Sequence, residues 1–510
     1  MKKRILKILK YTIILILIGL IGAFFWIDSE LTQMYGGHTT KVDYKQFKTK
    51  SVPTVIKNVN VLSSNGSKML NSQNVYFNEG KIISIDTTSI FPKNALIIDG
   101  QGKYLIPGLI DSHVHLLESE NDLLLYIANG ITYIREMTGT EKHLEWRNAI
   151  KNGSRIGPKI FVATGKLNNN SAIVGYISHW TRKEINVSSP NKANIVLQSM
   201  KDKGYDAIKL GSDLNKDTYF AISKASEEIG IPIIGHLPIQ VSLKDLWNSN
   251  QKAIAHIEEI VKALNREFGD YNSKSANEFL KFIKQRSDAV TDSILKNKIA
   301  IGSTINLMES LTRQKHDLTN ILKETPIIYV NSGQLEGTNI TSRGLGWLPK
   351  VNTYRLADDY PIENLSGNKI YWNTYAKAIQ ILLRKMVSKN VLVLSGTDAN
   401  TPVMVPGFSL HNELKSLTLS GMNNSQALLS ATSLPAKWMK VNTGTIEVGY
   451  DADLVLLNKN PLDNIENTNT IETVIVRGKV YNRKQLNKML NAVKEANNKS
   501  RTVEIKEFIN

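Results

Sequence analysis

The feature that most constrains the fold is a series of eight short apolar segments separated by stretches with a helical pattern. The segments are residues 105–116, 131–137, 158–164, 205–211, 231–237, 253–260, 298–305 and 391–399. Most are continuous apolar runs, as expected of parallel strands that helices cover on both faces. Eight such units predict an α/β fold, a (β/α)8 barrel of the TIM type, whose active site lies at the C-terminal ends of the strands.

Short alternating segments flank this central region on both sides. They include TVIKNVNVL from residue 54 and IETVIVRGKVYNR from residue 471, separated from their neighbours by turn residues. This pattern is typical of small antiparallel sheets. We therefore expect a small β-sandwich domain built from both ends of the chain. The expected division is 29–52 as a tether, 53–107 and 441–483 as the β-sandwich, 108–440 as the barrel and 484–510 as a C-terminal tail.

The first 28 residues form a separate segment. Five basic side chains lie within residues 2–10, and an uncharged run follows from Tyr11 to Ile27. This run reaches the roughly 17 to 25 residues that cross a bilayer and exceeds the ~7 to 15 of a signal-peptide core. We expect a membrane anchor whose basic flank stays in the cytoplasm, so that everything after Asp28 is extracytoplasmic. A cleaved signal segment, which would leave the protein secreted, is the alternative.

Composition limits the chemistry that the chain can perform. It contains no cysteine, so a transition metal must be held by histidine, carboxylate or modified lysine. The formal net charge is +17, but the basic residues are spread along the chain and do not alternate with aromatic residues in a stripe. We expect a surface compatible with an anionic membrane face and no nucleic-acid partner.

Ionisable residues lie at or near the ends of five of the eight apolar segments. They are His113, His115, Lys209, His236, His256 and Asp398. The first two stand at alternate positions, so in a strand they point to one face, and imidazole nitrogens bind zinc. Each residue alone has a structural interpretation, as a core histidine, a surface lysine or a helix cap. Because burial of such groups is costly unless they are paired or coordinated, six in equivalent positions predict a metal site.

These motifs resemble those of the amidohydrolase superfamily over roughly residues 53–482. The resemblance is carried by IPGLIDSHVHL, AIKLGSD, GHLP, AHIEE and SGTDAN, and it continues through GTIEVGYDADLVLLNKNPL. In the binuclear branch, which includes prolidase-like and imidazolonepropionase-like enzymes, it implies two divalent metal ions, with Zn2+ the expected metal. The first would be held by residues matching His113, His115 and Asp398, and the second by those matching His236 and His256. Carboxylated Lys209 would bridge them.

The same resemblance implies a reaction. A metal-bridged hydroxide would attack a carbonyl or phosphoryl centre, with Asp398 as general base and then general acid. Deaminases of the family instead use one metal and a glutamate a few residues after the histidine matching His236. Here Leu237, Pro238 and Ile239 follow, which favours the two-metal hydrolase. Asp111 is expected to support the site from outside the ligand set.

Two further segments indicate the substrate. PGFSLHNELKSLTLSGM, from Pro406, resembles the region after the last strand in enzymes that cleave peptide-like bonds. It makes His411 a possible substrate contact, with an ordinary amphipathic helix as the alternative. Residues 306–390 and 166–190 leave from the catalytic end, so we expect them to wall the pocket.

We therefore expect hydrolysis of a carbon–nitrogen amide bond in a dipeptide or acylated amino compound. The alternatives are hydrolysis of a lactone, cyclic amide or phosphoester, and a non-catalytic anchored binding protein on the same barrel. The sequence leaves the oligomeric state open.

Overall fold

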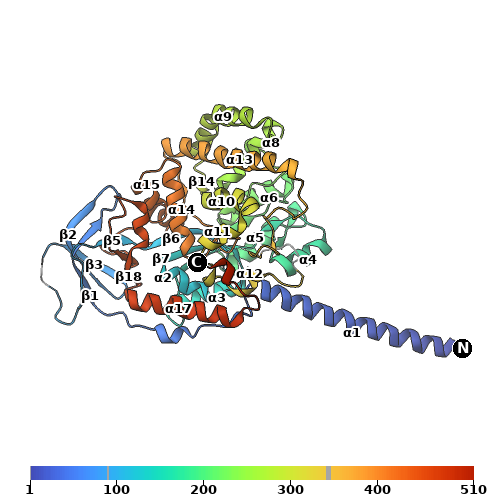
Figure 1. The fold of residues 1–510 in the computed structure, drawn as a ribbon, viewed down its shortest axis with the longest axis horizontal. Helices are drawn as coiled ribbons and strands as arrows, with labels where there is room; N and C mark the ends of the chain where they lie inside the picture. The colour runs from blue at the N-terminus through green and yellow to red at the C-terminus, as the bar shows by residue number, and fades with distance from the viewer. Residues whose placement is uncertain (1, 89–90, 341–345, 510) are drawn as a thin grey trace.

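The structure is a computed structural model that describes residues 2–88, 91–340 and 346–509. Helix α1 (Lys2–Met34) projects as a long rod from a body of parallel sheets and surrounding helices (Figure 1). A largely antiparallel sheet lies at the opposite end of the body from α1 (Figure 1). The chain is therefore a mixed α/β protein, and the predicted apolar N-terminal segment is helical.

The central region contains two parallel sheets. The first has the order β6-β7-β8 and the second the order β10-β9-β11-β12-β13-β14-β16. Their strands are β6 (Leu109–Val114), β7 (Ile131–Gly139), β8 (Lys159–Thr164), β9 (Leu167–Asn168), β10 (Ile185–Asn186), β11 (Ile208–Leu210), β12 (Ile233–Gly235), β13 (Gln251–Ile254), β14 (Ala300–Gly302) and β16 (Val393–Leu394). Each of the eight apolar segments contributes a strand, so the predicted parallel α/β arrangement is confirmed.

Backbone contacts link the two parallel sheets at both edges. Ala163 bridges to Ala207, joining β8 to the segment that enters β11, and Val114 bridges to Ala399, joining β6 to the segment that follows β16. The amide of Asp398 also donates to the carbonyl of His113 at 2.9 Å. The first and last of the eight strand segments are therefore neighbours, which brings residues almost 290 positions apart into contact.

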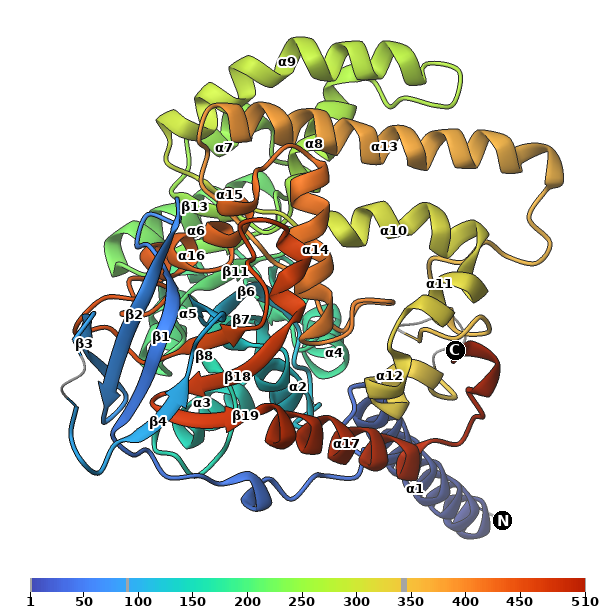
Figure 2. The same cartoon turned by 60° about the vertical axis from the view of Figure 1, so that its left-hand side comes forward.

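Helices connect the strands and cover the sheets (Figure 2). They are α2 (Asp122–Ala128), α3 (Glu141–Lys151), α4 (Ala172–Arg182), α5 (Ala193–Asp202), α6 (Lys216–Ile229), α7 (Leu243–Trp247), α8 (Ile257–Phe268), α9 (Ala276–Lys296), α10 (Ile305–His316), α11 (Leu318–Glu324), α12 (Ser332–Glu336), α13 (Ile362–Ser388), α14 (Phe408–Leu419), α15 (Asn424–Ser430) and α16 (Ser433–Met439). Local signals set their ends. For example, Asn215 caps α6 by accepting from the amide of Thr218, and Gly230 ends the helix at φ 74°.

The antiparallel region takes strands from both ends of the chain, as predicted. The expected sandwich has the form of one continuous sheet of eight strands in the order β19-β18-β17-β5-β1-β2-β3, with β4 paired to β1. The strands are β1 (Thr54–Leu62), β2 (Met69–Asn78), β3 (Lys81–Asp86), β4 (Leu96–Asp99), β5 (Tyr104–Pro107), β17 (Leu454–Leu457), β18 (Ile471–Val476) and β19 (Lys479–Asn482). At the junction with β6, the amide of Gly108 donates to the carbonyl of Asp453.

Both terminal segments pack against the body. The apolar part of α1 is long enough to cross a membrane, and its most apolar window is fully exposed. Its last turn is buried, because Leu31 and Met34 pack with Leu117 and Trp180. At the other end, the predicted tail contains α17 (Arg483–Ser500), which buries Leu486 among other residues. Short 3-10 turns complete the chain: η1 (Tyr44–Phe47), η2 (Pro190–Lys192), η3 (Ile327–Tyr329), η4 (Ile465–Asn469) and η5 (Lys506–Phe508).

Candidate active site

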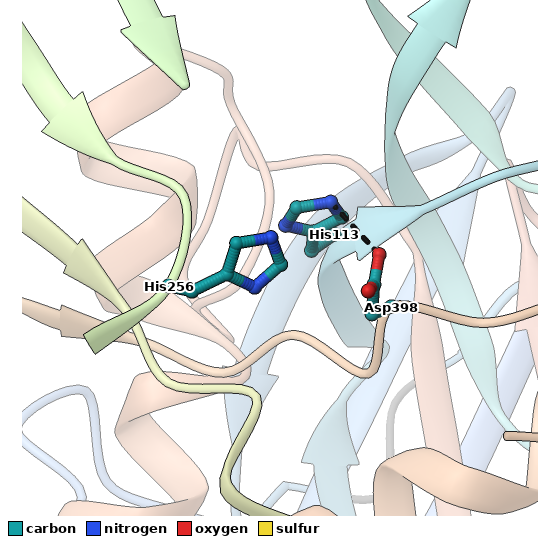
Figure 3. A group of neighbouring side chains, drawn as sticks. All are labelled: His113, His256 and Asp398. Atoms are coloured by element: carbon teal, nitrogen blue, oxygen red, sulfur yellow. Dashed lines mark ion pairs between the residues drawn. The ribbon is translucent and has the colours of Figure 1, made fainter. Parts of the chain in front are cut away.

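The structure brings the six predicted ligands together at the C-terminal ends of the parallel strands. Asp398 lies between the first two histidines, with its Oδ1 2.8 Å from His115 Nε2 and 3.1 Å from His113 Nε2. The rings of His113 and His256 are 4.5 Å apart, and those of His256 and His236 are 5.4 Å apart. Figure 3 shows His113, His256 and Asp398 pointing toward one another from three separate segments. Their ligand atoms lie within 4.8 Å of one another.

These residues form the floor of a pocket of about 1130 Å³. His115, Lys209, His236, His256 and Asp398 line it, while His113 lies just beneath them. Both segments that were expected to wall the pocket contribute residues. Segment 166–190 provides Lys166, His179, Thr181, Arg182, Lys183, Glu184 and Ile185, and segment 306–390 provides Ile340 and Tyr354. The pocket therefore matches the expected catalytic face.

Each of the four histidines has its Nδ1 held by a neighbouring group. His115 Nδ1 lies 2.7 Å from Thr138 Oγ1, and His256 Nδ1 lies 2.9 Å from Thr304 Oγ1. His113 Nδ1 lies 3.4 Å from the carbonyl of Ala255. A partner on one ring nitrogen fixes the ring plane and the tautomer, which leaves Nε2 available to bind a metal.

His236 has a carboxylate as its partner. Its Nδ1 lies 2.9 Å from Glu259 Oε1, in the first turn of α8. Burial alone would raise the pKa of Glu259. The contact with His236 and the charge of nearby Lys262 outweigh this effect and lower the pKa to about 2. A carboxylate that accepts from an imidazole orients the ring and makes Nε2 a stronger ligand. Glu259 therefore acts on the site through His236, from the start of α8.

Lys209 is fully buried and lies in the middle of the site. Its Nζ has no hydrogen-bond partner among the residues that the structure describes. Burial, together with the charge of Lys166, lowers the pKa of Lys209 to about 7. The end of the next strand, β12, fits closely against it, because a Cβ on Gly235 would lie 3.1 Å from Lys209 Cγ and 2.7 Å from the backbone of Leu210.

Asp398 is held in an unusual backbone conformation. Its φ of 57° falls in the left-handed region, which costs a residue other than glycine about 1 to 3 kcal/mol. Asp111 stabilises this turn, since its carboxylate accepts from the hydroxyl of Thr397 at 2.7 Å and from the amide of His113 at 3.2 Å. Asp111 thus supports the backbone around the site, as expected, and lies outside the ligand cluster.

A buried glutamate that the sequence analysis did not single out also stabilises the strand ends. Glu136, in β7, accepts from the amides of Leu116 and Thr138, both at 2.6 Å. It thereby fixes the segment after His115 and the residue that contacts the His115 ring. In the sequence, this role is indicated only by the position of Glu136, a charged residue inside the apolar run 131–137.

His411 lies elsewhere, and its predicted contact with substrate does not fit this placement. It is buried in α14, where Nδ1 is 2.9 Å from Thr468 Oγ1 and Nε2 is 3.1 Å from the carbonyl of Asn129. Burial lowers its pKa to about 4, so the ring is neutral and its two nitrogens join α14 to η4 and α2. Neighbouring Glu413 binds the amides of Ile305 and Asn306 at the start of α10. The alternative interpretation, a structural helix, therefore describes this segment.

The side chains present fit divalent metal binding. Burial lowers the pKa of His113 to about 3 and that of His236 to about 4, and it lowers the pKa of His256 well below its usual value. These rings are therefore neutral, which is the form that binds metals. The buried amine of Lys209 has no hydrogen-bond partner among the described residues. It lies beside these rings, where a metal would need a further oxygen ligand.

The comparisons with known proteins agree with this geometry. The model of the amidohydrolase family matches residues 343–481. An adenine deaminase from Clostridium perfringens is 25% identical over 364 residues, which are 63% of this chain and 58% of that enzyme. The chain thus spans less than two thirds of this relative.

Solved structures share the fold at low identity. A bottromycin amidohydrolase has a TM-score of 0.65 and 18% identity, covering 91% of this chain and 96% of that one. A Xaa-Pro dipeptidase with bound methionine has a TM-score of 0.59 and 18% identity, covering 84% and 100%. The model of the amidohydrolase family thus matches the C-terminal part of the chain, and the similarity to amidohydrolases that its motifs predicted is found.

The contact between Glu259 and His236 generates a prediction. In Glu259→Gln, the ring of His236 loses its charged partner, so the affinity for the more weakly held metal should fall about 10- to 100-fold. Competition with a chromogenic chelator measures this change. The matched control is Glu258→Gln, because Glu258 accepts from Tyr375 and Lys262 instead. Equal metal affinities for both variants would contradict the assigned role of Glu259.

Proposed function

We propose that this protein is a metal-dependent hydrolase that cleaves an amide carbon–nitrogen bond, with two divalent metal ions, Zn2+ first among them, at its centre. The observation that carries the proposal is Lys209, whose buried amine has no partner among the described residues and lies beside four histidines and an aspartate. An ammonium cannot bind a cation. A carbamate formed from the neutral amine and carbon dioxide is an anionic oxygen ligand that can span two metals, and its formation releases one proton.

The chain's own residues define the steps of the reaction. His113, His115, Asp398, His236 and His256, with Lys209 between them, would hold the metal ions, which would supply an activated water and polarise the carbonyl under attack. Asp398, with its carboxylate next to His113 and His115 and open to the pocket, accepts the proton from that water and delivers it to the leaving amine. Thr138, Glu259 and Thr304 keep the imidazole rings in the required orientation throughout.

The scaffold for this chemistry is a closed (β/α)8 barrel over residues 108–440. The bridges from Val114 to Ala399 and from Ala163 to Ala207 support closure, because they join the edges of the two parallel sheets. Residues 53–107 and 441–483 form the accompanying sheet domain. In such a barrel, the groups for catalysis come from several strand ends, as they do here.

The pocket wall supports a substrate with a free carboxylate, such as an N-acyl amino acid or a dipeptide. Lys142 of this wall pairs with Glu118 at 2.8 Å. Lys203 pairs with Glu141 at 2.7 Å. Lys166 also lines the pocket but makes no ion pair with any residue that the structure describes, so it is available to an anionic group of the substrate.

Deamination of a purine is a second candidate, favoured by the similarity to an adenine deaminase. Against it stands the segment after His236, where Leu237, Pro238 and Ile239 replace the catalytic glutamate expected of single-metal deaminases. Hydrolysis of lactones, cyclic amides or phosphoesters, and ligand binding without catalysis, would use the same fold. The substrate is what distinguishes these candidates.

The enzyme acts outside the cytoplasmic membrane, anchored by α1. The support is the exposed, uncharged run from Tyr11 to Ile27 behind a basic flank. Basic residues beside a membrane-spanning helix favour the cytoplasmic side, which leaves the catalytic body on the other side.

The role of Lys209 generates a prediction about metal content. The wild-type protein, loaded with Zn2+ and dialysed, should retain two equivalents, whereas Lys209→Met should retain one or fewer and lose at least 100-fold in activity, because the bridging ligand is gone. Metal analysis by mass spectrometry measures the first effect independently of turnover. Lys252→Met, at an exposed lysine on β13, is the control and should keep both metals. Two retained equivalents in Lys209→Met would overturn the binuclear site.

The reaction class is tested by a substrate screen. Dipeptides and N-acyl amino acids should release free amine, measured with an amine-reactive dye, and this release should stop after treatment with a chelator and resume with added Zn2+. Adenine and adenosine derivatives, tested in parallel for ammonia release, should remain unchanged. Ammonia release without amine release would favour the deaminase, and turnover of lactones or phosphoesters alone would move the activity to those bonds.

Lys166 gives the screen a finer test. Lys166→Met should raise the KM of an N-acyl amino acid at least tenfold, since a charge-assisted hydrogen bond contributes about 1.5 to 3 kcal/mol. The KM of the same compound with its carboxylate converted to an amide should stay unchanged. A parallel loss on both compounds would assign Lys166 to the metal site and not to carboxylate recognition.

A further inference from the structure

Helix α4 has its apolar side chains on the outside. Ile173 and Tyr176 are 76% and 67% exposed, and Val174 and Ile177 are also exposed. We call these four residues the α4 apolar face. The opposite side, which packs on the protein, consists of small residues such as Gly175 and Ser178. This distribution is the reverse of that expected for a helix in water.

The packing of α4 against β10 fixes this orientation. A Cβ on Gly175 would lie 2.2 Å from Asn186 Nδ2, so the helix approaches β10 too closely for a larger inward residue. Asn186 in turn binds the backbone of Asn170, just before the helix. Rotation of α4 to bury its apolar face would break these contacts. These contacts therefore keep the α4 apolar face on the outside of the protein.

The contacts of Trp180 and Tyr35 hold α4 against α1. The ring of Trp180 stacks on Phe24 with centroids 4.7 Å apart, and its Nε1 donates to Asp28 at 2.9 Å. The hydroxyl of Tyr35 donates to the carbonyl of Thr181 at 2.6 Å. These contacts involve the C-terminal part of α1, around the end of the uncharged run 11–27. Figure 1 shows α1 leaving the body close to α4.

We propose that α4 lies in the lipid interface, with its apolar face embedded in the outer leaflet beside α1, so that the pocket opens at the membrane surface. This proposal rests on the proposed anchoring by α1. Residues 11–27 span roughly 25 Å as a helix, close to the ~30 Å hydrocarbon core, which puts Phe24 and Asp28 at its outer edge. Tyr176 and Trp180 then lie at the level where aromatic residues concentrate in membrane proteins.

Continuity with α1 selects the bilayer over a protein partner. Trp180, about one turn after Tyr176 and Ile177 on α4, stacks on Phe24 at the end of the apolar part of α1, so one apolar environment can cover both helices. An amphipathic helix whose apolar face carries aliphatic and aromatic side chains, as that of α4 does, is typical of helices that lie in the membrane interface.

The pocket lies between these two membrane-facing elements. Leu31 and Met34 of α1 line it together with Tyr35, which follows the helix, and so do His179 and the residues from Thr181 to Ile185 at and just after the end of α4. Lys209 and Asp398 belong to the same cavity. The catalytic groups therefore face a mouth at headgroup level, where an amide held in the bilayer by an apolar tail has direct access.

Site-directed fluorescence on the full-length chain tests this arrangement. Because the protein has no native cysteine, Ile173→Cys carries a single environment-sensitive label. In proteoliposomes of phosphatidylcholine and phosphatidylglycerol, the label should shift to the blue and be quenched at least twofold by lipids that carry a shallow spin label. Val448→Cys is the matched control: Val448 is 62% exposed and lies beside β3, far from α1, so its label should stay in water.

A third labelled variant separates this proposal from the anchor itself. Leu17→Cys should be quenched by deep spin-labelled lipids if α1 spans the bilayer. Quenching at Leu17 with none at Ile173 would overturn the interfacial role of α4 and leave the anchor intact. Shielding of the Ile173 label that depends on protein concentration, without lipid quenching, would assign the face to a second copy and would also overturn the proposal. None of these measurements requires catalysis.

Discussion

The burial of the Lys209 amine is the constraint on which the rest of the site depends. An isolated ammonium in a protein interior is strongly disfavoured, and here the group has no hydrogen-bond partner among the described residues. The amine must therefore be neutral or derivatised, and burial lowers its pKa to about 7, where the neutral form is available near physiological pH. The strand geometry supports this position. Thr164 binds the Lys209 amide at 2.9 Å, and Gly235 leaves room beside the Lys209 side chain.

The histidines around Lys209 are oriented by a repeated arrangement. Each ring that follows one strand is held by a group at or just after the end of the next strand along the chain: Thr138 holds His115, Glu259 holds His236, and Thr304 holds His256. Parallel packing makes this possible, because neighbouring strands end at the same edge. The polar contacts therefore couple ligand orientation to strand pairing, so a shift in register would misalign the rings. Pre-organised ligands of this kind reduce the reorganisation that metal binding requires.

The sequence could predict the ligand cluster but only part of its support. His113, His115 and the other four stood out because ionisable groups recur at the ends of apolar runs, and parallel strands bring such ends together. Glu259 and Thr304 could not be assigned in this way, because their roles depend on the distance between segments that are not adjacent in sequence. The predicted substrate contact of His411 does not fit the structure for the same reason. Its helix was recognised, but the side of the helix that faces the pocket depends on how α14 packs. The inverted polarity of α4 was visible in principle, yet its meaning requires the contact between Trp180 and Phe24.

Substrate choice depends on the walls of the pocket and not on its floor. One sequence relative is a deaminase and one structural neighbour is a dipeptidase, so proteins similar to this chain act on different carbon–nitrogen bonds. In this chain the walls combine Lys166, which forms no ion pair with a described residue, with apolar residues from α1 such as Leu31 and Met34. A cationic group near the metal ligands and an apolar rim next to the proposed membrane surface match the two ends of an amphiphile. An acylated amino compound presents its amide between those ends, at the height of Asp398, so the same walls that select the molecule would also align the bond to be broken.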